Sequence, residues 1–349
     1  MSDKTAPTID CFRVLVPETD PLGAAAYAKM MRPMFDFEIP DFAKGAPFSS
    51  VTDVYRLPDA TVSQTTTSAS RLTRSLKTIA RSAADQVLVL CYRSGGFTFE
   101  TGGVTRRVKA GELAVFDLSQ EVVFEAAVVD NISLAISRRK LEALFPVVDH
   151  AHGFVLEPCP LTTVLFGMIR NVLMIGAAIP LAEGRAIADA MVQLAAACLD
   201  MPSTAANAGN GTISLIAIKA AIERRLSDSA LGPQTLLDEF GITRSTLYRL
   251  FEPFGGVSAY IMERRLRHAF RRMTDPLGPS LRISQLAFDL GFSHPSAFTR
   301  AFKGFFGVSP KDALALAVSP ERRELLFLAT PEARPYLHPI GAQAQVDEA

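Results

Sequence analysis

The sequence contains few of the residues from which disulfides and metal sites are built. Its four cysteines are widely spread with no C-x-x-C pair, which predicts reduced thiols rather than a disulfide framework or a zinc site. Of five histidines, only His150 and His152 form a close pair, and they follow the predicted strands instead of lying on them. A metal-dependent enzyme needs clustered histidine and carboxylate ligands. We therefore expect no enzyme, no metal and no cofactor.

Targeting and phosphate-binding signals are also scarce. No apolar segment follows Met1, which argues against a signal peptide. The most membrane-like stretch, residues 161–179, carries Arg170 and Asn171 in its middle, so a buried or dimer-forming helix is the better interpretation. The glycine pairs at 95–96 and 102–103 are typical of turns rather than of a phosphate-binding loop. These absences predict a cytoplasmic protein with no membrane partner.

The chain has no net charge, since 36 basic residues balance 36 acidic ones. The balance is uneven along the sequence. Residues 212–316 contain 14 Lys and Arg against 9 Asp and Glu, a net charge of +5, and the remainder carries −5. This asymmetry favours a polyanionic partner for the C-terminal part.

The first 200 residues predict a β-rich domain followed by helices. Strand-forming runs lie at 87–92, 97–100 and 113–116, separated by glycine turns, a spacing typical of a sandwich or barrel. A helix is expected at 73–84, before these strands. Further helices are expected from the periodicity of residues 138–145, 161–176 and 181–199. Residues 201–211 are small, polar and glycine-bearing, which predicts a linker, and the proline-dotted segment 317–349 predicts a flexible tail.

The C-terminal part contains an internal repeat. Residues 236–251 match residues 286–302: Leu236 aligns with Leu286 at an offset of 50, and Arg249 with Arg300 at an offset of 51. A duplication on this scale rarely arises by chance. The two copies predict two units of the same structure.

Each copy reads as a helix, a turn and a second helix. Gly241 and Gly291 stand just past the first helices, where a left-handed residue is needed. Thr243 and Ser293 are placed to cap the second helices. The apolar positions of those second helices are expected to face inward. Their outward candidates are Arg244, Ser245, Tyr248 and Arg249 in the first copy, and His294, Ser296, Thr299, Arg300 and Lys303 in the second.

This arrangement predicts binding to double-stranded DNA. The second helix of a helix-turn-helix unit lies in the major groove, where its N-terminal residues reach base edges. Arginine bonds guanine in a bidentate way, and serine or threonine serves bases or phosphates. Most protein–DNA hydrogen bonds go to the backbone, so Arg249 and Arg300 have a phosphate or packing role as an equal alternative. For His294, a structural role at the start of the helix is the alternative to a base contact. Lys303 is expected to hold phosphate.

These residues resemble the AraC/XylS family of bacterial transcription regulators. The match is densest over residues 283–310 and extends over about 212–316, including Arg265 and Leu266 in the joining helix. A weaker similarity, over residues 111–119 and 137–141, is to the cupin-like sensing domain of part of that family. The resemblance implies two DNA-reading helices, a small-molecule effector, frequent homodimerisation and RNA polymerase as a further candidate partner.

The predicted fold is therefore a two-domain α+β protein. Residues 1–200 form a cupin-like barrel for effector binding and dimerisation, with helices over 138–200. Residues 201–211 are the linker, 212–316 form an all-α domain of two helix-turn-helix units on a joining helix, and 317–349 are the tail. The alternatives are a cupin-type enzyme and a DNA-binding protein without a ligand switch. Tyr92, Arg93, Phe97 and Phe99 are candidates to line a pocket, although alternating aromatic residues more often form a core.

Overall fold

The computed structural model describes residues 7–82, 84–145, 148–207, 215–274, 281–318 and 331–340. Its chain divides into two compact units. One contains residues 1–75, 85–200 and 324–349, and the other contains residues 76–84 and 201–323. Each unit therefore includes a segment that is distant in sequence from the rest of it.

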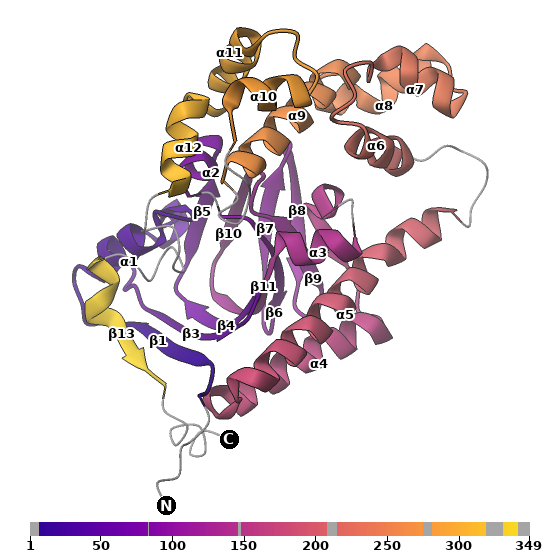
Figure 1. The fold of residues 1–349 in the computed structure, drawn as a ribbon. Coiled ribbons are helices and arrows are strands. Elements are labelled where there is room, and N and C mark those ends of the chain that lie inside the picture. The colour runs from indigo at the N-terminus through magenta and orange to yellow at the C-terminus, as the bar shows by residue number, and fades with distance from the viewer. Residues whose placement is uncertain are drawn as a thin grey trace, which may run out of the picture. The chain divides into compact units, whose positions relative to one another are not determined.

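Two antiparallel sheets make the N-terminal unit sandwich-like (Figure 1). In spatial order, the eight-stranded sheet consists of β12 (Phe154–Leu156), β9 (Leu113–Asp117), β6 (Gln86–Tyr92), β11 (Val129–Ser137), β4 (Ala60–Thr67), β3 (Ser50–Leu57), β1 (Asp10–Val16) and β13 (Leu337–Pro339). The five-stranded sheet consists of β2 (Asp36–Glu38), β5 (Ser70–Arg74), β10 (Val122–Ala126), β7 (Gly96–Thr101) and β8 (Val104–Lys109).

Helices cover one face of the larger sheet. Successive side chains of a strand point to opposite faces. Val62, Val89 and Leu134 belong to a buried cluster that also holds Leu165 of α4 and Met191 of α5. The helices of this unit are α1 (Gly23–Met31), α3 (Arg138–Leu144), α4 (Pro160–Ile175) and α5 (Leu181–Asn207), with short 3-10 turns η1 (Asp41–Ala43), η2 (Val148–Ala151), η3 (Gly176–Ala178) and η6 (Pro331–Tyr336).

Helix α4 retains an exposed apolar face. The segment Pro160–Ala178 is long and apolar enough to cross a membrane by length and composition, and 33% of it is buried in the protein. Leu165, Ile169 and Val172 form its inward face, while Val164 and Met174 are exposed. A core helix of a soluble protein passes the same test of length and composition, so the inward face favours packing on the sheet.

The C-terminal unit is helical. It contains α6 (Leu215–Arg224), α7 (Pro233–Phe240), α8 (Arg244–Phe251), the turn η4 (Glu252–Phe254), α9 (Val257–Thr274), α10 (Ile283–Asp289), α11 (Pro295–Phe306) and α12 (Pro310–Val318). Two apolar clusters hold it together. One is built around Leu236, Leu247 and Phe251, and the other around Leu286, Phe298 and Phe302. The two predicted helix-turn-helix units thus each have a core of their own.

A helix from the first part of the chain completes the second of these cores. Helix α2 (Leu76–Ser82) lies in sequence between strands β5 and β6, inside the predicted helical stretch 73–84. Ile79 and Ala80 are each 1% exposed and belong to the cluster of Phe298 and Phe302. The sequence gives no signal for this placement, since the apolar face of α2 is equally suited to its own β-domain.

Two of the predicted segment boundaries need correction. The 317–349 segment is not a flexible tail throughout, because η6 and β13 pack onto the N-terminal unit. Strand β13 pairs with β1, Ala333 is buried, and the Tyr336 hydroxyl donates a hydrogen bond to Asp20 at 2.6 Å. The predicted linker 201–211 begins with helix, since α5 continues to Asn207, and residues 208–211 lie outside the described residues. Backbone pairing in the first case, and helical hydrogen bonding in the second, outweigh the composition of these segments.

Candidate nucleic-acid interface

The first reading helix, α8, begins where the sequence predicts. Gly241 adopts a left-handed conformation with φ of 61° after α7, which a residue without a Cβ reaches at little cost. Thr243 is the N-cap, and its hydroxyl accepts a hydrogen bond from the Thr246 amide at 3.3 Å. Leu247 and Phe251 then point into the core. The remaining face of α8 is left for solvent.

All four outward candidates of α8 are exposed. Arg244 and Tyr248 lie one helical turn apart, as do Ser245 and Arg249, so the four side chains share one face. The exposed fraction of Tyr248 is 47%, so its ring is open to solvent beside the two arginines. An aromatic ring and two guanidinium groups on one exposed helix face suit contact with a nucleic acid.

The second reading helix, α11, begins one residue later than the sequence predicts. Ser293 is not its N-cap. His294 holds that position with an extended backbone and makes no side-chain capping bond, and Pro295 is the first helical residue. Proline has no amide hydrogen to satisfy and its fixed φ suits a first turn, so Pro295 decides where the helix starts. His294 is exposed at the mouth of this helix.

The outward face of α11 carries Ser296, Arg300 and Lys303, all exposed. Phe298, Phe302 and Phe306 occupy the opposite face and are buried. Thr299 differs from the prediction in one respect: it is half-buried, and its hydroxyl donates to the Pro295 carbonyl at 3.0 Å within the helix. Its hydroxyl proton is therefore committed to the helix, which leaves the oxygen as an acceptor for a partner.

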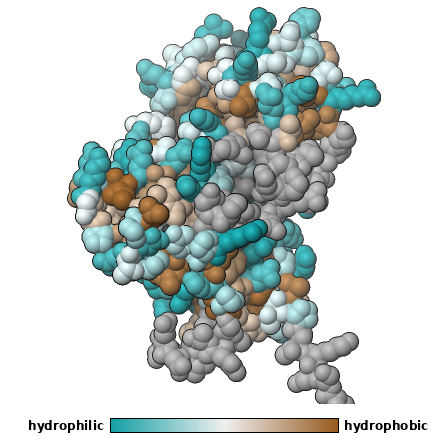
Figure 2. Space-filling model, turned by 90° about the vertical axis from the view of Figure 1, so that its left-hand side faces the viewer, coloured by the Kyte–Doolittle hydropathy of each residue, from teal (hydrophilic) through white to brown (hydrophobic). Residues whose placement is uncertain are grey.

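Several other arginines of this unit are engaged in holding it together. Arg264 bonds Glu223 at 2.6 Å, Arg267 bonds Glu263 at 2.7 Å and Arg272 bonds Asp289 at 3.2 Å. By contrast, Arg244, Arg249 and Arg300 make no ion pair within the described part of the chain. Figure 2 shows hydrophilic side chains projecting from the surface of this unit, with smaller hydrophobic patches between them. Three arginines without an internal ion pair among the described residues thus lie on the two reading helices.

Arg265 of the joining helix α9 contacts both helix-turn-helix units and holds them together. Its guanidinium donates to the carbonyls of Leu226 and Asp228, at 3.1 and 2.6 Å, in the loop before the first unit. The turn of the second unit packs on the same group, because a Cβ added to Gly291 would lie 3.0 Å from Arg265 Nη2. The sequence indicates Arg265 only through the family resemblance. The structure shows why an arginine is needed there.

This packing predicts unequal effects for two glycine substitutions. Gly241→Ala and Gly291→Ala both force an alanine into a left-handed conformation, which costs about 1–2 kcal/mol. At Gly241 an added Cβ meets nothing within 4 Å, whereas at Gly291 it lies 3.0 Å from both Arg265 and Ser229. We expect the overpacking to add about 1–3 kcal/mol at Gly291 only. Urea unfolding of both variants measures this, and equal losses of unfolding free energy would contradict it.

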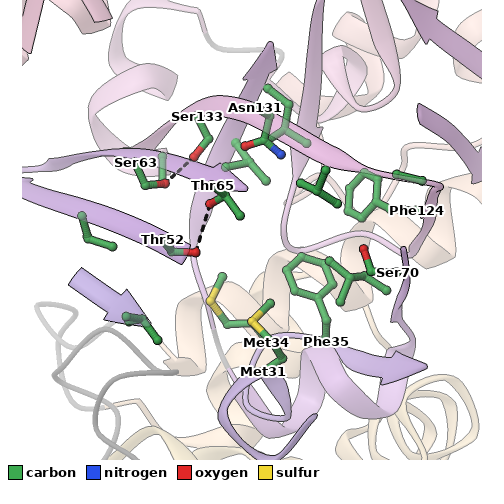
Figure 3. A pocket seen from close by; sticks show the side chains of 18 of the residues that line it. Met31, Met34, Phe35, Thr52, Ser63, Thr65, Ser70, Phe124, Asn131 and Ser133 are labelled. Atoms are coloured by element: carbon green, nitrogen blue, oxygen red, sulfur yellow. Dashed lines mark hydrogen bonds between the residues drawn. The ribbon is translucent and has the colours of Figure 1, made fainter. Parts of the chain in front are cut away.

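The N-terminal unit contains a cavity of about 180 Å³. Met31 at the end of α1, together with Met34 and Phe35, lines one side of it (Figure 3). Of the four residues proposed from sequence, Tyr92 and Phe97 line it. Phe99 is a core residue, and Arg93 pairs with Asp130. Most of the lining was missed, because isolated serines and threonines on strands give no functional signal.

The predicted close histidine pair does not point to a catalytic centre. His152 accepts a hydrogen bond from the Asp117 amide on Nδ1, and its Nε2 lies 3.0 Å from the Glu121 carbonyl. Both ring nitrogens thus bond backbone groups, one at the end of β9 and one just before β10. Within the described residues, no three His, Cys, Asp or Glu side chains are grouped so as to hold a metal ion.

Comparison with known proteins agrees with this geometry. A family described as a helix-turn-helix domain matches residues 236–315. The chain is 32% identical over 94 residues to the XylDLEGF operon transcriptional activator 1 of Pseudomonas putida, covering 26% of this chain and 27% of that protein. The transcriptional activator NphR of a Rhodococcus species is 24% identical over 267 residues, or 72% of this chain and 76% of NphR.

The similarity to solved structures extends beyond the DNA-binding domain. The crystal structure of the AraC-like transcriptional activator CuxR has a TM-score of 0.50 and 25% identity, and covers 75% of this chain and 95% of that chain. The chain matches only about a quarter of the length of the first curated relatives, yet the fold match includes the β-rich part. Together with the two helix-turn-helix units, these similarities show that residues 236–315 form a helix-turn-helix domain and that the chain is similar to transcription activators of the AraC type.

Proposed function

We propose that this protein binds promoter or operator DNA by inserting α8 and α11 into the major groove. The observation that carries the proposal is the placement of Arg244, Arg249 and Arg300, which are exposed on these helices and unpaired within the described residues. Several other arginines of the unit, among them Arg264 and Arg272, bond internal partners. Pairing three guanidinium groups with the phosphates of a duplex is favourable, because the charge-assisted hydrogen bonds are strong and condensed counterions are released. The same groups have no evident value for the fold alone.

The residues take different roles in this proposal. Arg244, Ser245, Tyr248 and Arg249 of α8, and His294, Ser296 and Arg300 of α11, face the bases or the adjacent backbone. Lys303 lies two turns into α11 and suits a phosphate contact, because a flexible ammonium serves as a point charge. Thr299 contributes its oxygen as an acceptor and its methyl group as an apolar contact.

Salt dependence tests the proposal. Four cationic side chains, Arg244, Arg249, Arg300 and Lys303, are available for phosphates. Loss of up to four counterions predicts a slope of log K against log salt down to about −3.6. Fluorescence anisotropy measures this slope. The full-length protein is titrated onto a duplex from its own upstream region at several salt concentrations from about 50 to about 300 mM. Binding that is absent, or unaffected by salt, would refute the assignment.

We further propose that the N-terminal unit is a cupin-like effector domain. The cavity between its two sheets supports this, since concave, mostly apolar cavities with a few polar groups are typical small-molecule sites. The position of α2 supports a link to DNA binding. Its two flanking strands, β5 and β6, carry the cavity-lining residues Leu72 and Gln86, and α2 itself packs into the core behind the second reading helix. A ligand that favours one arrangement of these strands shifts the population of DNA-competent molecules.

Homodimerisation through α4 completes the proposed assembly. Its exposed Val164, Met174 and Ile175, with Leu181 at the start of α5, form an apolar stripe of the kind that a second copy covers. We place the protein in the cytoplasm, with α4 as a packing and dimer helix rather than a membrane span. The curated relatives reported above are named as activators, which favours activation and makes RNA polymerase a candidate partner.

A further inference from the structure

The cavity of the N-terminal unit is lined without a single charged side chain among the described residues. Its lining alternates along each strand of the larger sheet. Thr61, Ser63 and Thr65 of β4 face the cavity, while the intervening Val62 packs in the core cluster under α4 and α5. The period of two explains how a sheet with two covered faces provides both a core and a binding wall.

Strand register gathers the polar groups of this wall into rows. Thr65 pairs with Thr52 on β3 and with Asn131 on β11, and Asn131 pairs with Tyr92 on β6. Thr52 Oγ1 and Thr65 Oγ1 are hydrogen-bonded at 3.3 Å. In the next row Ser63 Oγ and Ser133 Oγ lie 2.6 Å apart (Figure 3). The wall offers hydroxyl and carboxamide groups, which donate and accept hydrogen bonds but carry no charge.

The side facing this wall is apolar and adaptable. Met30, Met31, Met34 and Phe35 come from α1 and the residues after it, and Phe124 comes from β10. In Figure 3 the side chains of Met31, Met34 and Phe35 lie across the cavity from Ser63 and Ser133. Thioether side chains adjust to irregular shapes and pack favourably against aromatic rings. A flat apolar body fits between this side and the polar wall.

Size and charge together restrict the occupant. A cavity of about 150 Å³ lined by apolar side chains accepts benzene, so a volume of 180 Å³ suits one ring with a small substituent. A carboxylate or ammonium ion here would lose its hydration without gaining an opposite charge, which is strongly unfavourable. We propose that the cavity binds an uncharged molecule of single-ring size, with one hydroxyl or carboxamide group directed at the Thr52, Thr65 and Asn131 row. The ligand class rests on the effector role proposed above.

A matched ligand series on the full-length protein tests this. Benzamide and benzyl alcohol are uncharged at pH 7.5, whereas benzoate and benzylammonium carry one charge on the same ring. Saturation-transfer NMR with competition is expected to show one shared site that binds the uncharged pair at least about tenfold more tightly, a difference that one unpaired buried charge readily exceeds. Benzoate or benzylammonium binding as tightly as benzamide would overturn the proposal, as would the absence of binding by every member.

Two neighbouring threonines provide the site assignment. Thr65→Val removes the hydroxyl of the polar row with little change of volume. Its control is Thr66→Val, because Thr66 is exposed and points away from the cavity. We expect benzamide to bind several-fold more weakly to Thr65→Val and unchanged to Thr66→Val. Ser133→Ala repeats the test should Thr65→Val fold poorly. Unchanged binding to the lining variants places the ligand elsewhere and overturns the proposal.

DNA binding of the same preparation separates this inference from the proposed function. Salt-dependent DNA binding together with preference for a charged ligand refutes the ligand class and leaves the DNA-binding role intact. Ligand binding without DNA binding refutes the proposed function and leaves the ligand class intact. Uncharged-ligand binding that changes DNA affinity supports both.

Discussion

Replacing Arg249 and Arg300 together by alanine is expected to weaken DNA binding by well over tenfold. The two side chains occupy equivalent positions in the repeated units and both are exposed. Loss of a base-contacting arginine costs about 1–3 kcal/mol, so the pair is expected to lose about 2–6 kcal/mol of binding free energy. Because neither side chain supports the fold, unfolding free energy should change little. Anisotropy titration at one fixed salt concentration measures the effect.

The control for this double variant must lose the same charge elsewhere. Arg106 and Arg107 are exposed on strand β8 of the N-terminal unit. Arg106→Ala with Arg107→Ala lowers the net charge by two without touching either reading helix, so we expect an effect below about threefold from screened long-range attraction. Equal weakening by the two double variants would mean that overall charge, rather than the reading helices, governs binding.

Lysine substitutions at the same positions distinguish the two roles left open for these arginines. Lysine keeps the charge but loses the planar fork needed for bidentate contact with guanine. If Arg249 and Arg300 contact phosphate, Arg→Lys should retain most of the affinity and its salt dependence. If they read bases, the lysine variants should lose discrimination between the upstream duplex and a scrambled duplex while the salt slope stays similar.

The second large effect is expected from Arg138, at the centre of a buried ion cluster. Arg138 Nη1 lies 2.6 Å from Asp117 Oδ2, and Nη2 lies 2.6 Å from Asp149 Oδ1. The side chains of all three are 1% exposed. Burial alone disfavours the guanidinium charge, but attraction to Asp117 and Asp149 holds the pKa of Arg138 above its ordinary value. The cluster joins the end of β9, the start of α3 and η2.

Arg138→Met is therefore expected to destabilise the N-terminal unit by about 3–5 kcal/mol, since it leaves two carboxylates buried without their cation. For a unit of this size the melting temperature should fall by about 6–20 °C. Arg138→Lys should lower the melting temperature by less than Arg138→Met does, because the charge is kept. Some loss is still expected, since one ammonium group lacks the planar fork that joins both carboxylates. Differential scanning calorimetry of the full-length protein measures each change.

An exposed ion pair gives the reference for Arg138. Arg71 and Glu125 lie 2.6 Å apart with side chains 41% and 34% exposed. Arg71→Ala should cost at most about 1 kcal/mol, because solvent screens such pairs. If Arg138→Met is as mild as Arg71→Ala, the cluster does not hold the sheet and the helices together.

The DNA-binding domain was largely predictable because its signals are local. Apolar spacing, a glycine after the first helix and a cap before the second lie within about twenty residues of each other in each copy. The duplication then checks one unit against the other, and the outward positions follow from helical geometry. The start of α11 was misplaced by one residue, since Pro295 competes with the hydroxyl of Ser293 as a start signal, and Thr299 is half-buried rather than fully outward.

What the sequence alone determined about this protein is thus the pair of reading helices and the charges they present, because residues three or four apart on a helix share a face whatever surrounds them. Tertiary structure alone decided the cavity, the docking of α2, the return of η6 and β13, and the Arg138 cluster. Each brings together residues that are far apart in sequence, such as Thr52 with Asn131 or Tyr336 with Asp20. Strand register and burial fix those pairings, and neither leaves a trace in local composition.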